Sequence, residues 1–577
     1  MSPNRDRLFP LCLYLFSFLL QIVYLLEIKS NPFFNLPVLD EAIHLRWANA
    51  LARGEPWFPG EPYFRAPLYP LFLSFLFRIG GAGVLFPRIV QAAIGALGPV
   101  LLYRLGRRLF PSTTAAVAAI LLALNGMALY FQASFLIVSI LIPLDLAVLL
   151  LLARSADRPE RAALWLGAGV LLGLSAVARP NILLFGAAVP FWAFALDGRP
   201  ARTLRRAVLP FLLGAALPIA PVALHNLAAG EPVWIAWQGG INFYIGNNPG
   251  SDGMTAIAPG ADGTWWGGYR DMIRFAEESE GKPLSRRGVS AYWTGRAFAF
   301  FRDDPGGAAR LFARKAFLLV NDFEVSNNQG IYFFRRFSRI LAVLMHLGWG
   351  ILFPLAAAGA VFIRWDRRRA LPALFFLVYG AGIVLFFVTA RYRMPLLPVL
   401  LLPAATALVE WPRRIRRNRD GRLALSLVLF AGAALLSNWN PLGLEKERYA
   451  QGYYNAGAQL LLAGRFEEAI PWFGGAIEEE PAYRNARYNL GLCYSYLNRL
   501  DDAERELRTV AREHPDFADG RYALGAVLER LGRPEEAVAE AVAALRLRPD
   551  MEAARLLLAR AAAAADSLKM TGGAVKR

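Results

Sequence analysis

The sequence has almost no cysteine and little histidine, and this scarcity excludes several classes of protein. Its 577 residues include 2 cysteines and 4 histidines. Cys12 and Cys493 lie far apart, and the histidines show no spacing typical of metal ligands. Neither a disulfide framework nor a thiolate or histidine metal site is therefore predicted. The chain also lacks a glycine-rich phosphate-binding loop, which argues against a nucleotide as substrate.

Acidic residues are the second shortage. The chain has 45 acidic and 63 basic residues, a net charge of +18, and 56% of it is hydrophobic. A mean hydropathy of +0.35 is typical of a polytopic membrane protein. Nucleic-acid binding is not predicted, because the arginines form short clusters between apolar runs, as the positive-inside rule describes. These clusters occupy residues 104–108, 154–161, 199–206, 364–369 and 413–419.

Hydropathy predicts an all-α membrane bundle of about eleven spans. No small-x-small cleavage site precedes Asn31, so the first span is expected to be a retained anchor. Residues 67–80 are apolar but short, and treating them as a juxtamembrane helix puts every arginine cluster on the cytoplasmic side with the N-terminus. The outer face then holds the loops 28–85 and 228–336 and the chain after 438. The predicted spans are 8–27, 86–105, 113–130, 136–153, 162–178, 182–197, 207–227, 337–363, 370–389, 394–411 and 423–438.

The C-terminal part of the chain repeats with a period of 34 residues. Small residues at fixed positions let paired helices approach closely, and a proline ends each second helix. The repeated positions are Gly457, Gly491 and Gly525, followed by Pro481, Pro515 and Pro549. The units resemble tetratricopeptide repeats: about three repeats and a capping helix over 445–565, then a disordered tail over 566–577. We expect this α-solenoid to bind a protein or peptide partner; the alternative is a spacer without a partner.

Two adjacent carboxylates, Asp40 and Glu41, follow the first span. Ile43 and Trp47 recur at helical spacing after them, which predicts an amphipathic helix in the membrane interface with His44 on its polar face. Asp40 lies where an N-cap residue would lie, so helix capping is the structural alternative to a functional acid. Glu41 adds a second charge that a cap does not require. An acid pair at a membrane edge is suited to taking the proton of an acceptor hydroxyl.

The order of these features resembles that of a known enzyme superfamily. After Asp40-Glu41, the segment Tyr63–Leu68 has the pattern Tyr-Phe-basic-x-Pro-Leu, and a later span ends in Leu105–Phe110. Over residues 1–440 this order resembles the GT-C superfamily of polytopic glycosyltransferases, especially the protein O-mannosyltransferase and aminoarabinose transferase group and the RgtA/B/C/D-like family. The resemblance implies a sugar donor linked to polyprenyl phosphate. It also implies that Asp40 acts as base on the acceptor, with Glu41 beside it.

The sequence departs from these relatives at two points. Arg65 stands where some relatives have a lysine, and Phe64 where they have a glutamate. Relatives also often carry a carboxylate in the second outer turn, whereas Tyr130–Phe135 has none. No cofactor is therefore predicted with certainty, and a divalent metal is left as an alternative that no second acid supports.

A phosphate-linked leaving group requires positive charge at the outer surface of the membrane. Arg65, Arg179, Arg391 and Arg393 lie in the first outer loop or at predicted outer membrane boundaries. Guanidinium groups suit bidentate phosphate binding, so these four are the predicted donor-phosphate residues. The alternative is that they reach lipid phosphates or pair with loop carboxylates.

The long outer loop contains a segment rich in glycine, asparagine and aromatic residues, which is typical of tight turns with exposed amides. We predict that it closes over the site and binds sugar hydroxyls, and that Lys315 reaches the headgroup; a structured loop without ligand contact is the alternative. The predicted substrate-loop residues are Asn242, Tyr244, Asn247 and Asn248.

The combined hypothesis is an integral-membrane glycosyltransferase that moves a sugar from a polyprenyl-phosphate donor to a lipid, glycan or protein acceptor, with inversion. It is expected in a bacterial inner membrane, with the N-terminus cytoplasmic and the repeats periplasmic. Its expected partners are the donor, membrane lipid and a ligand of the repeats, and no nucleic acid. Two alternatives stay open: an O-antigen-ligase or polymerase type of enzyme, using residues such as His225, and an inactive scaffold working through its repeats.

Overall fold

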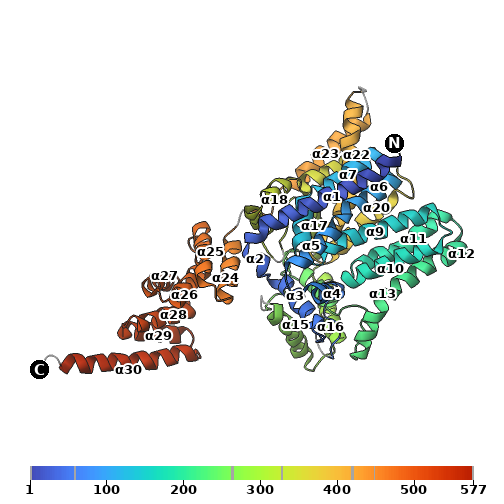
Figure 1. Cartoon of the computed structure of the whole chain (residues 1–577). Coiled ribbons are helices and arrows are strands. Elements are labelled where there is room, and N and C mark those ends of the chain that lie inside the picture. Colours follow the sequence, from blue (N-terminus) through green and yellow to red (C-terminus); the bar gives the residue numbers. More distant parts are fainter. Residues whose placement is uncertain are drawn as a thin grey trace. The chain divides into compact units, whose positions relative to one another are not determined.

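The computed structural model describes residues 3–56, 60–261, 265–326, 329–416, 421–446 and 449–574, and this described part is helical, without a β-strand. The chain divides into two compact units (Figure 1). The bundle unit comprises Met1–Ser30 and Pro37–Leu444, and the solenoid unit comprises Asn31–Leu36 and Glu445–Arg577. The all-α prediction is confirmed.

The helices of the bundle unit fall into an N-terminal and a C-terminal set. The N-terminal set is α1 (Pro3–Glu27), η1 (Ile28–Ser30), α3 (Leu39–Ala52), α4 (Leu68–Gly80), α5 (Leu85–Gly95), α6 (Leu97–Leu109), α7 (Ser112–Ala123), α8 (Gly126–Ala133), α9 (Val138–Asp157), α10 (Ala162–Ala178), α11 (Ile182–Asp197), α12 (Pro200–Thr203), the π-helical turn η2 (Leu204–Val208) and α13 (Leu209–Ala228). The C-terminal set is α14 (Gly239–Gly246), α15 (Trp265–Glu280), α16 (Arg286–Asp303), α17 (Pro305–Val320), η3 (Ile331–Phe337), α18 (Arg339–Leu344), α19 (Trp349–Ala360), α20 (Ala370–Leu385), α21 (Ala390–Arg393), η4 (Met394–Leu396), α22 (Leu397–Ile415) and α23 (Gly421–Asn438).

Six helical runs among the described residues are long and apolar enough to cross a membrane, or seven if the bent pair α7–α8 forms one span. The six are Leu8–Ser30, Leu85–Leu109, Val138–Asp157, Pro200–Ala228, Ala390–Ile415 and Gly421–Asn438. Five shorter apolar helices accompany them: α4, α10, α11, α19 and α20. The helix predicted over 67–80 is α4. The total of eleven spans stays a prediction.

Two of the predicted spans are broken, and the breaks lie against each other. The span predicted over 113–130 bends by 52° between α7 and α8, where Asn125 caps α8 through Ala128 N at 3.0 Å. The span predicted over 337–363 is interrupted between α18 and α19. Asn125 Nδ2 donates to Leu347 O in that interruption at 3.0 Å. The side-chain amide thus satisfies main-chain groups that an unbroken helix would satisfy itself, which hydropathy alone does not reveal.

Glycines allow the most extensive helix contact in the bundle unit, between α10 and α13, which run side by side (Figure 1). A Cβ atom on Gly169 would lie 2.0 Å from Phe211 O, and one on Gly173 would lie 2.4 Å from Ala215 O. On the opposite helix, a Cβ on Gly214 would lie 2.2 Å from Leu166 O. Small residues of this kind let membrane helices pack backbone against backbone.

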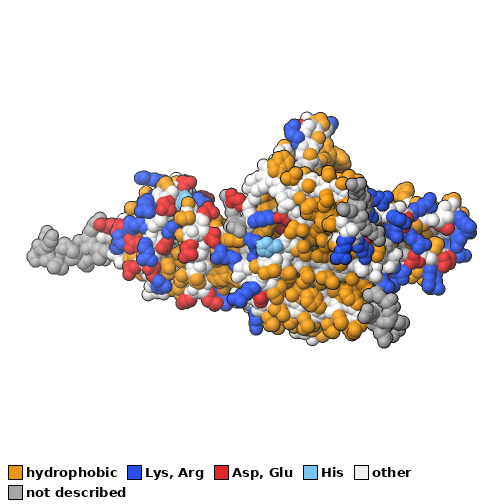
Figure 2. Space-filling model, turned by 90° about the horizontal axis from the view of Figure 1, so that it is seen from above, with side chains coloured by type: hydrophobic (Ala, Val, Ile, Leu, Met, Phe, Trp, Pro, Cys, Tyr) orange, Lys and Arg blue, Asp and Glu red, His pale blue; other side chains and the backbone are white. Residues whose placement is uncertain are grey.

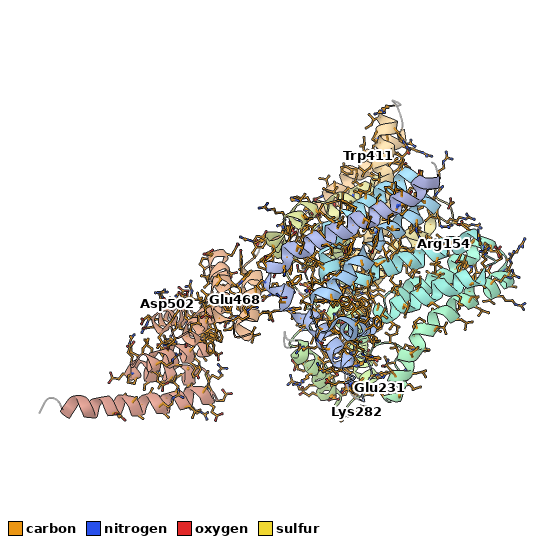
Figure 3. The ribbon with its side chains drawn as sticks, in the orientation of Figure 1. Arg154, Glu231, Lys282, Trp411, Glu468 and Asp502 are labelled. Atoms are coloured by element: carbon orange, nitrogen blue, oxygen red, sulfur yellow. The ribbon has the colours of Figure 1, made fainter. Side chains whose placement is uncertain are left out.

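The arginine clusters gather at one end of the bundle unit. Arg108 and Arg368 both pair with Asp157, the latter at 2.8 Å, and Arg369 Nε donates to Leu109 O at 2.7 Å. Arg154 and Trp411 lie toward this end, whereas Glu231 and Lys282 of the long loop lie toward the other (Figure 3). This separation agrees with the predicted positive-inside arrangement.

The surface of the bundle unit carries a broad apolar area, while the solenoid unit shows mixed charges (Figure 2). Leu15 and Leu19 of α1 are 48% and 60% exposed, and Leu213 and Leu217 of α13 are 64% and 61% exposed. Continuous exposed leucines of this kind suit a lipid environment.

The solenoid unit consists of paired helices with the predicted repeat. Its elements are α2 (Pro32–Asn35), α24 (Ala450–Leu462), α25 (Phe466–Glu479), α26 (Arg484–Tyr496), α27 (Leu500–Glu513), α28 (Ala518–Arg530), α29 (Pro534–Leu547) and α30 (Glu552–Ala574). Gly457 and Gly491 pack against Phe473 and Leu507 of the second helix in their own repeats. The predicted capping helix is α30. It continues through the part of the tail predicted to be disordered as far as Ala574, and 575–577 lie outside the described residues.

The α10–α13 contact gives a test of the bundle. Gly169→Ala places a methyl group against a backbone carbonyl and is expected to destabilise the folded protein by about 1–3 kcal/mol. Gly167→Ala in the same helix meets only Leu151 at 3.5 Å and is expected to be neutral or slightly stabilising. Thermal unfolding in detergent measures both, and equal melting temperatures for the two variants would contradict the packing.

Candidate active site

Helix α3 carries Asp40 and Glu41 in its first turn. Its N-cap is Val38, whose side chain makes no capping hydrogen bond, and the Asp40 carboxylate is engaged elsewhere. The capping alternative for Asp40 is therefore not observed. Leu39 has φ of +50°, a left-handed conformation that costs a non-glycine residue roughly 1–2 kcal/mol. Strain of this kind tends to collect at functional sites.

The Asp40 carboxylate lies between two arginines from distant parts of the chain. Arg65 Nη1 donates to Oδ1 at 2.5 Å and Arg391 Nη1 donates to Oδ2 at 2.6 Å, while Asp40 itself is only 4% exposed. Burial would raise the pKa of Asp40, but the charges of Arg65 and Arg391 outweigh burial and hold that pKa well below its usual range. The side chain is thus an ionised acceptor clamped by two cations.

Glu41 and His44 hold the turn predicted at 130–135. Phe135 N donates to Glu41 Oε2 at 3.0 Å, and His44 Nδ1 lies 2.9 Å from Phe135 O. A carbonyl oxygen only accepts, so Nδ1 carries the hydrogen and Nε2 is left as an acceptor. Burial lowers the pKa of His44 to about 4 and raises the pKa of Glu41. His44 is therefore a buried neutral group.

Arg179 approaches the same region from the end of α10. It caps that helix in an extended conformation, with its N–H donating to Ser175 O at 2.6 Å, as expected for a residue that precedes proline. Its guanidinium carbon lies 3.6 Å from the centre of the Tyr392 ring. Among the described residues, Arg179 Nη1 is buried without a hydrogen-bond partner.

A cavity of about 250 Å³ lies next to these side chains, and His44 lines it whereas Asp40 and Glu41 do not. Arg65, Arg179, Arg391 and Asn242 all line this cavity, so four of the predicted site residues come together. The lining residues that the sequence did not indicate as site residues include His44, Tyr69 and Tyr392. Tyr392 lies between two arginines in the sequence, and no local pattern marks it as a site residue. Tyr69 donates to Gln91 Oε1 at 2.8 Å, a tertiary contact that no local pattern reveals.

Arg393 does not line the cavity, and its side chain is buried among other protein groups. It is 1% exposed, pairs with Glu324 Oε2 at 2.5 Å and donates to Asn321 O at 2.6 Å and Phe323 O at 3.0 Å. Its guanidinium is enclosed by protein acceptors, so of the two arginines in α21 only Arg391 lines the cavity.

The predicted substrate loop is also largely internal. Asn247 donates to Phe243 O and Leu385 O, each at 2.8 Å, and Asn248 donates to Tyr244 O at 2.9 Å. Both asparagines are buried, and the Tyr244 ring packs on Trp293 at 4.6 Å. Asn247 and Asn248 therefore shape the loop rather than meet a sugar, and Asn242 is the one predicted loop residue that lines the cavity.

Lys315 does not reach the cavity as a headgroup ligand. It is fully buried, and its ammonium donates to Asn247 Oδ1 at 2.8 Å, Phe386 O at 3.0 Å and Gly246 O at 3.1 Å. Burial lowers the pKa of Lys315 to about 7. The lysine joins the segments at 246–247 and 386 and so supports the cavity wall from behind.

The cavity does not suit a divalent cation. Among the described residues there is no cluster of three or more His, Cys, Asp or Glu side chains able to hold a metal. Three guanidinium groups line the cavity, and the one nearby ionised carboxylate is paired with two of them. The positive potential of this arrangement favours an anion.

Comparison with known sequence families decides the class of protein. Residues 64–225 match the family described as dolichyl-phosphate-mannose-protein mannosyltransferase. The matched segment lies within the bundle unit and indicates a glycosyltransferase. The match includes Arg65 and Arg179, and tetratricopeptide repeat families match residues 460–527 and 518–551. The predicted glycosyltransferase activity, the resemblance to the protein O-mannosyltransferase group and the C-terminal tetratricopeptide repeats are confirmed.

Two solved structures are similar to parts of this chain. The archaeal oligosaccharyltransferase AglB from Archaeoglobus fulgidus, in complex with an inhibitory peptide and a dolichol-phosphate, is 16% identical over 81% of this chain and 60% of its own, with a TM-score of 0.40. The first tetratricopeptide repeat domain of human RPAP3 is 20% identical over 21% of this chain and 96% of its own, with a TM-score of 0.21. No curated protein matches the chain.

The contrast between Arg393 and surface arginines gives a test. Arg393→Leu leaves Glu324 buried without its cation, and loss of one partner of such a pair costs about 3–5 kcal/mol. Arg413→Leu removes an exposed pair with Glu410, an interaction of about 0–1 kcal/mol. Yield and melting temperature in detergent are expected to fall sharply for the first and little for the second. A well-folded Arg393→Leu protein with weakened donor binding would instead restore the predicted phosphate role.

Proposed function

We propose that this glycosyltransferase moves a sugar from a polyprenyl-phosphate donor to an acceptor hydroxyl at the outer face of a bacterial inner membrane, with inversion. The observation that carries the proposal is Asp40 held between Arg65 and Arg391, beside a cavity that Arg179 also lines. The description of the matching family, which names a dolichyl-phosphate-linked sugar, supports a lipid-phosphate donor.

The arginines supply the site for the donor phosphate. Arg65 pairs with one carboxylate oxygen of Asp40 and Arg391 pairs with the other. Arg179 contributes a buried donor atom without a hydrogen-bond partner among the described residues. A phosphate has enough oxygens to engage all three guanidinium groups, and charge-assisted hydrogen bonds of this kind are strong. The same cations then stabilise the charge that develops on the leaving group.

Donor binding also prepares Asp40 for catalysis. Arg65 and Arg391 line the cavity in front of Asp40 and lower its basicity. A phosphate that competes for these arginines weakens both ion pairs, which frees a carboxylate oxygen and raises its proton affinity. The donor is therefore expected to bind before the acceptor.

The transfer is then a single displacement. The acceptor O–H bond breaks and its proton goes to Asp40, while the acceptor oxygen forms a bond to the anomeric carbon. The bond from that carbon to the phosphate oxygen breaks, and its electron pair leaves with the polyprenyl phosphate. Attack from the face opposite the phosphate inverts the anomeric centre.

A second, more open cavity of about 480 Å³ adjoins the first and offers a path for the isoprenoid chain. Pro180 and Ala236 line both cavities. The second cavity is otherwise lined mainly by apolar side chains, including Leu183, Val233 and Trp234. An apolar chain attached to a phosphate beside Arg179 can leave along this surface without entering water.

The repeats complete the proposed organisation. The predicted topology puts the N-terminus in the cytoplasm and the solenoid unit on the side of the acceptor. We propose that the solenoid unit binds a protein or peptide that brings the acceptor or a partner enzyme. The O-antigen-ligase alternative receives no support at His225, whose ring stacks on Tyr63 at 4.3 Å.

Asp40→Asn tests the proposal directly. The amide keeps the size of the side chain but cannot take a proton, so transfer is expected to fall about 10²–10⁴-fold. The assay follows sugar transfer from a polyprenyl-phosphate donor in reconstituted membranes. The acceptor is first named by mass spectrometry of envelope glycans and glycoproteins from cells with and without the protein. Glu55→Gln, at an exposed acid in the same loop, is the matched control. Full activity in a correctly folded Asp40→Asn protein would sink the assignment.

A further inference from the structure

Tyr392 lies between Arg391 and Arg393 in α21. Its ring contacts two of the cations that line the cavity, Arg179 from the end of α10 and Arg391 from α21. The guanidinium carbon of Arg179 lies 3.6 Å from the centre of its ring, and that of Arg391 lies 5.1 Å from it. The Tyr392 hydroxyl accepts from Arg391 Nη2 at 3.4 Å, and the ring lines the cavity. A tilted contact with Phe387, at 5.4 Å between ring centres, supports the ring from the loop before α21.

Two guanidinium groups that lie near one another repel, so a nearby group that attracts cations is needed to stabilise both. The negative face of an aromatic ring attracts a cation, and arginine stacks well on such a ring. Arg391 has Asp40 as a second anchor. Arg179 has a different second neighbour: its charge acts on buried Asp145 in α9, whose Oδ1 accepts from Ser175 Oγ at 2.6 Å.

The ring therefore fixes the cation that has no direct carboxylate contact among the described residues. Arg179 stacks closely on Tyr392 and also lines the cavity, where another ligand can meet it. Arg391 reaches the same ring at a longer distance while it holds Asp40. One side chain thus determines the spacing between the cation that clamps the carboxylate and the cation that is open to an anion.

We propose that Tyr392 is a positioning residue that holds Arg179 and Arg391 at the spacing required by the donor phosphate, and so sets donor affinity rather than the rate of the chemical step. This inference rests on the proposed function. It concerns the ring and not the hydroxyl, because the ring contacts both guanidinium groups and the hydroxyl contacts only one.

A matched pair of variants tests this role. Tyr392→Phe keeps the ring and removes the hydroxyl, whereas Tyr392→Leu removes the ring. In initial-rate measurements with varied polyprenyl-phosphate sugar, Tyr392→Leu is expected to raise the donor KM about tenfold, the size of one partly desolvated cation–π contact, with kcat changed less than about threefold. Tyr392→Phe is expected to stay within about twofold of wild type in both constants. Tyr392→Met serves in place of the leucine variant if that protein does not fold.

A second measurement separates positioning from a general loss of structure. Polyprenyl phosphate without sugar competes with the donor, and its inhibition constant is expected to rise in parallel with the donor KM in Tyr392→Leu. Because Tyr392 is proposed to act through Arg179, Arg179→Gln combined with Tyr392→Leu is expected to weaken donor binding by less than the product of the single effects. Melting temperatures of all variants are measured alongside.

Three outcomes would overturn the role of Tyr392. They are a fall in kcat at unchanged donor KM, an equal loss in the phenylalanine and leucine variants, and fully multiplicative effects of Tyr392 and Arg179. Failure of the proposed function is distinguishable, because wild-type protein would then use no polyprenyl-phosphate sugar at all. If wild type uses that donor and Asp40→Asn does not, but Tyr392→Leu keeps the wild-type donor KM, only the positioning role fails.

Discussion

The Asp40 carboxylate between Arg65 and Arg391 is the interaction on which the rest of the site depends. It joins the first outer loop, the segment before α4 and the segment before α22, which are separated by 25 and 351 residues from Asp40. Removing one member of a buried charged group leaves the others without compensation, at a cost of several kcal/mol. The three segments are therefore held together by charge at the place where a charged substrate has to bind. Strain at Leu39 is tolerated in the same place because these ion pairs and the buried face of α3 fix the backbone.

The periodicity of the sequence was sufficient to predict the elements that depend on residue spacing. The repeats, the apolar helices and the helix after Asp40 follow from residue spacing, and the arginine clusters follow from the charge rule. Spacing does not reveal where a helix breaks if the break is stabilised from elsewhere in the chain. Asn125 and Leu347 are 222 residues apart, yet their hydrogen bond stabilises the interruption in one helix against the interruption in another. This is a tertiary contact, and no window of the sequence contains it.

The arginines show the same limit at the level of single side chains. Arg391 and Arg393 look equivalent in the sequence, but α21 is helical, and two residues along a helix turn a side chain by ~200°. One arginine therefore faces the cavity and Asp40, and the other faces Glu324 and the carbonyls of 318–323. Tyr392 lies between them in angle as well as in sequence. Residue type predicted a group of arginines for a phosphate site, while the helix phase decided which of the two arginines in α21 lines the cavity.

Residues 130–135 contain no acidic side chain, although relatives often have one at this turn. The contribution of this turn is main chain: Phe135 N binds Glu41 and Phe135 O fixes the tautomer of His44. Glu41 thus accepts a main-chain hydrogen bond, and burial raises the pKa of its carboxyl. Asp40 is paired with two of the three guanidinium groups that line the cavity. This excess of positive charge is what a phosphate neutralises on binding. Under the proposed function, the same arginines restrain Asp40 until the donor binds, so the base and the donor site form one charge-balanced unit and the carboxylate becomes available when the leaving group is in place.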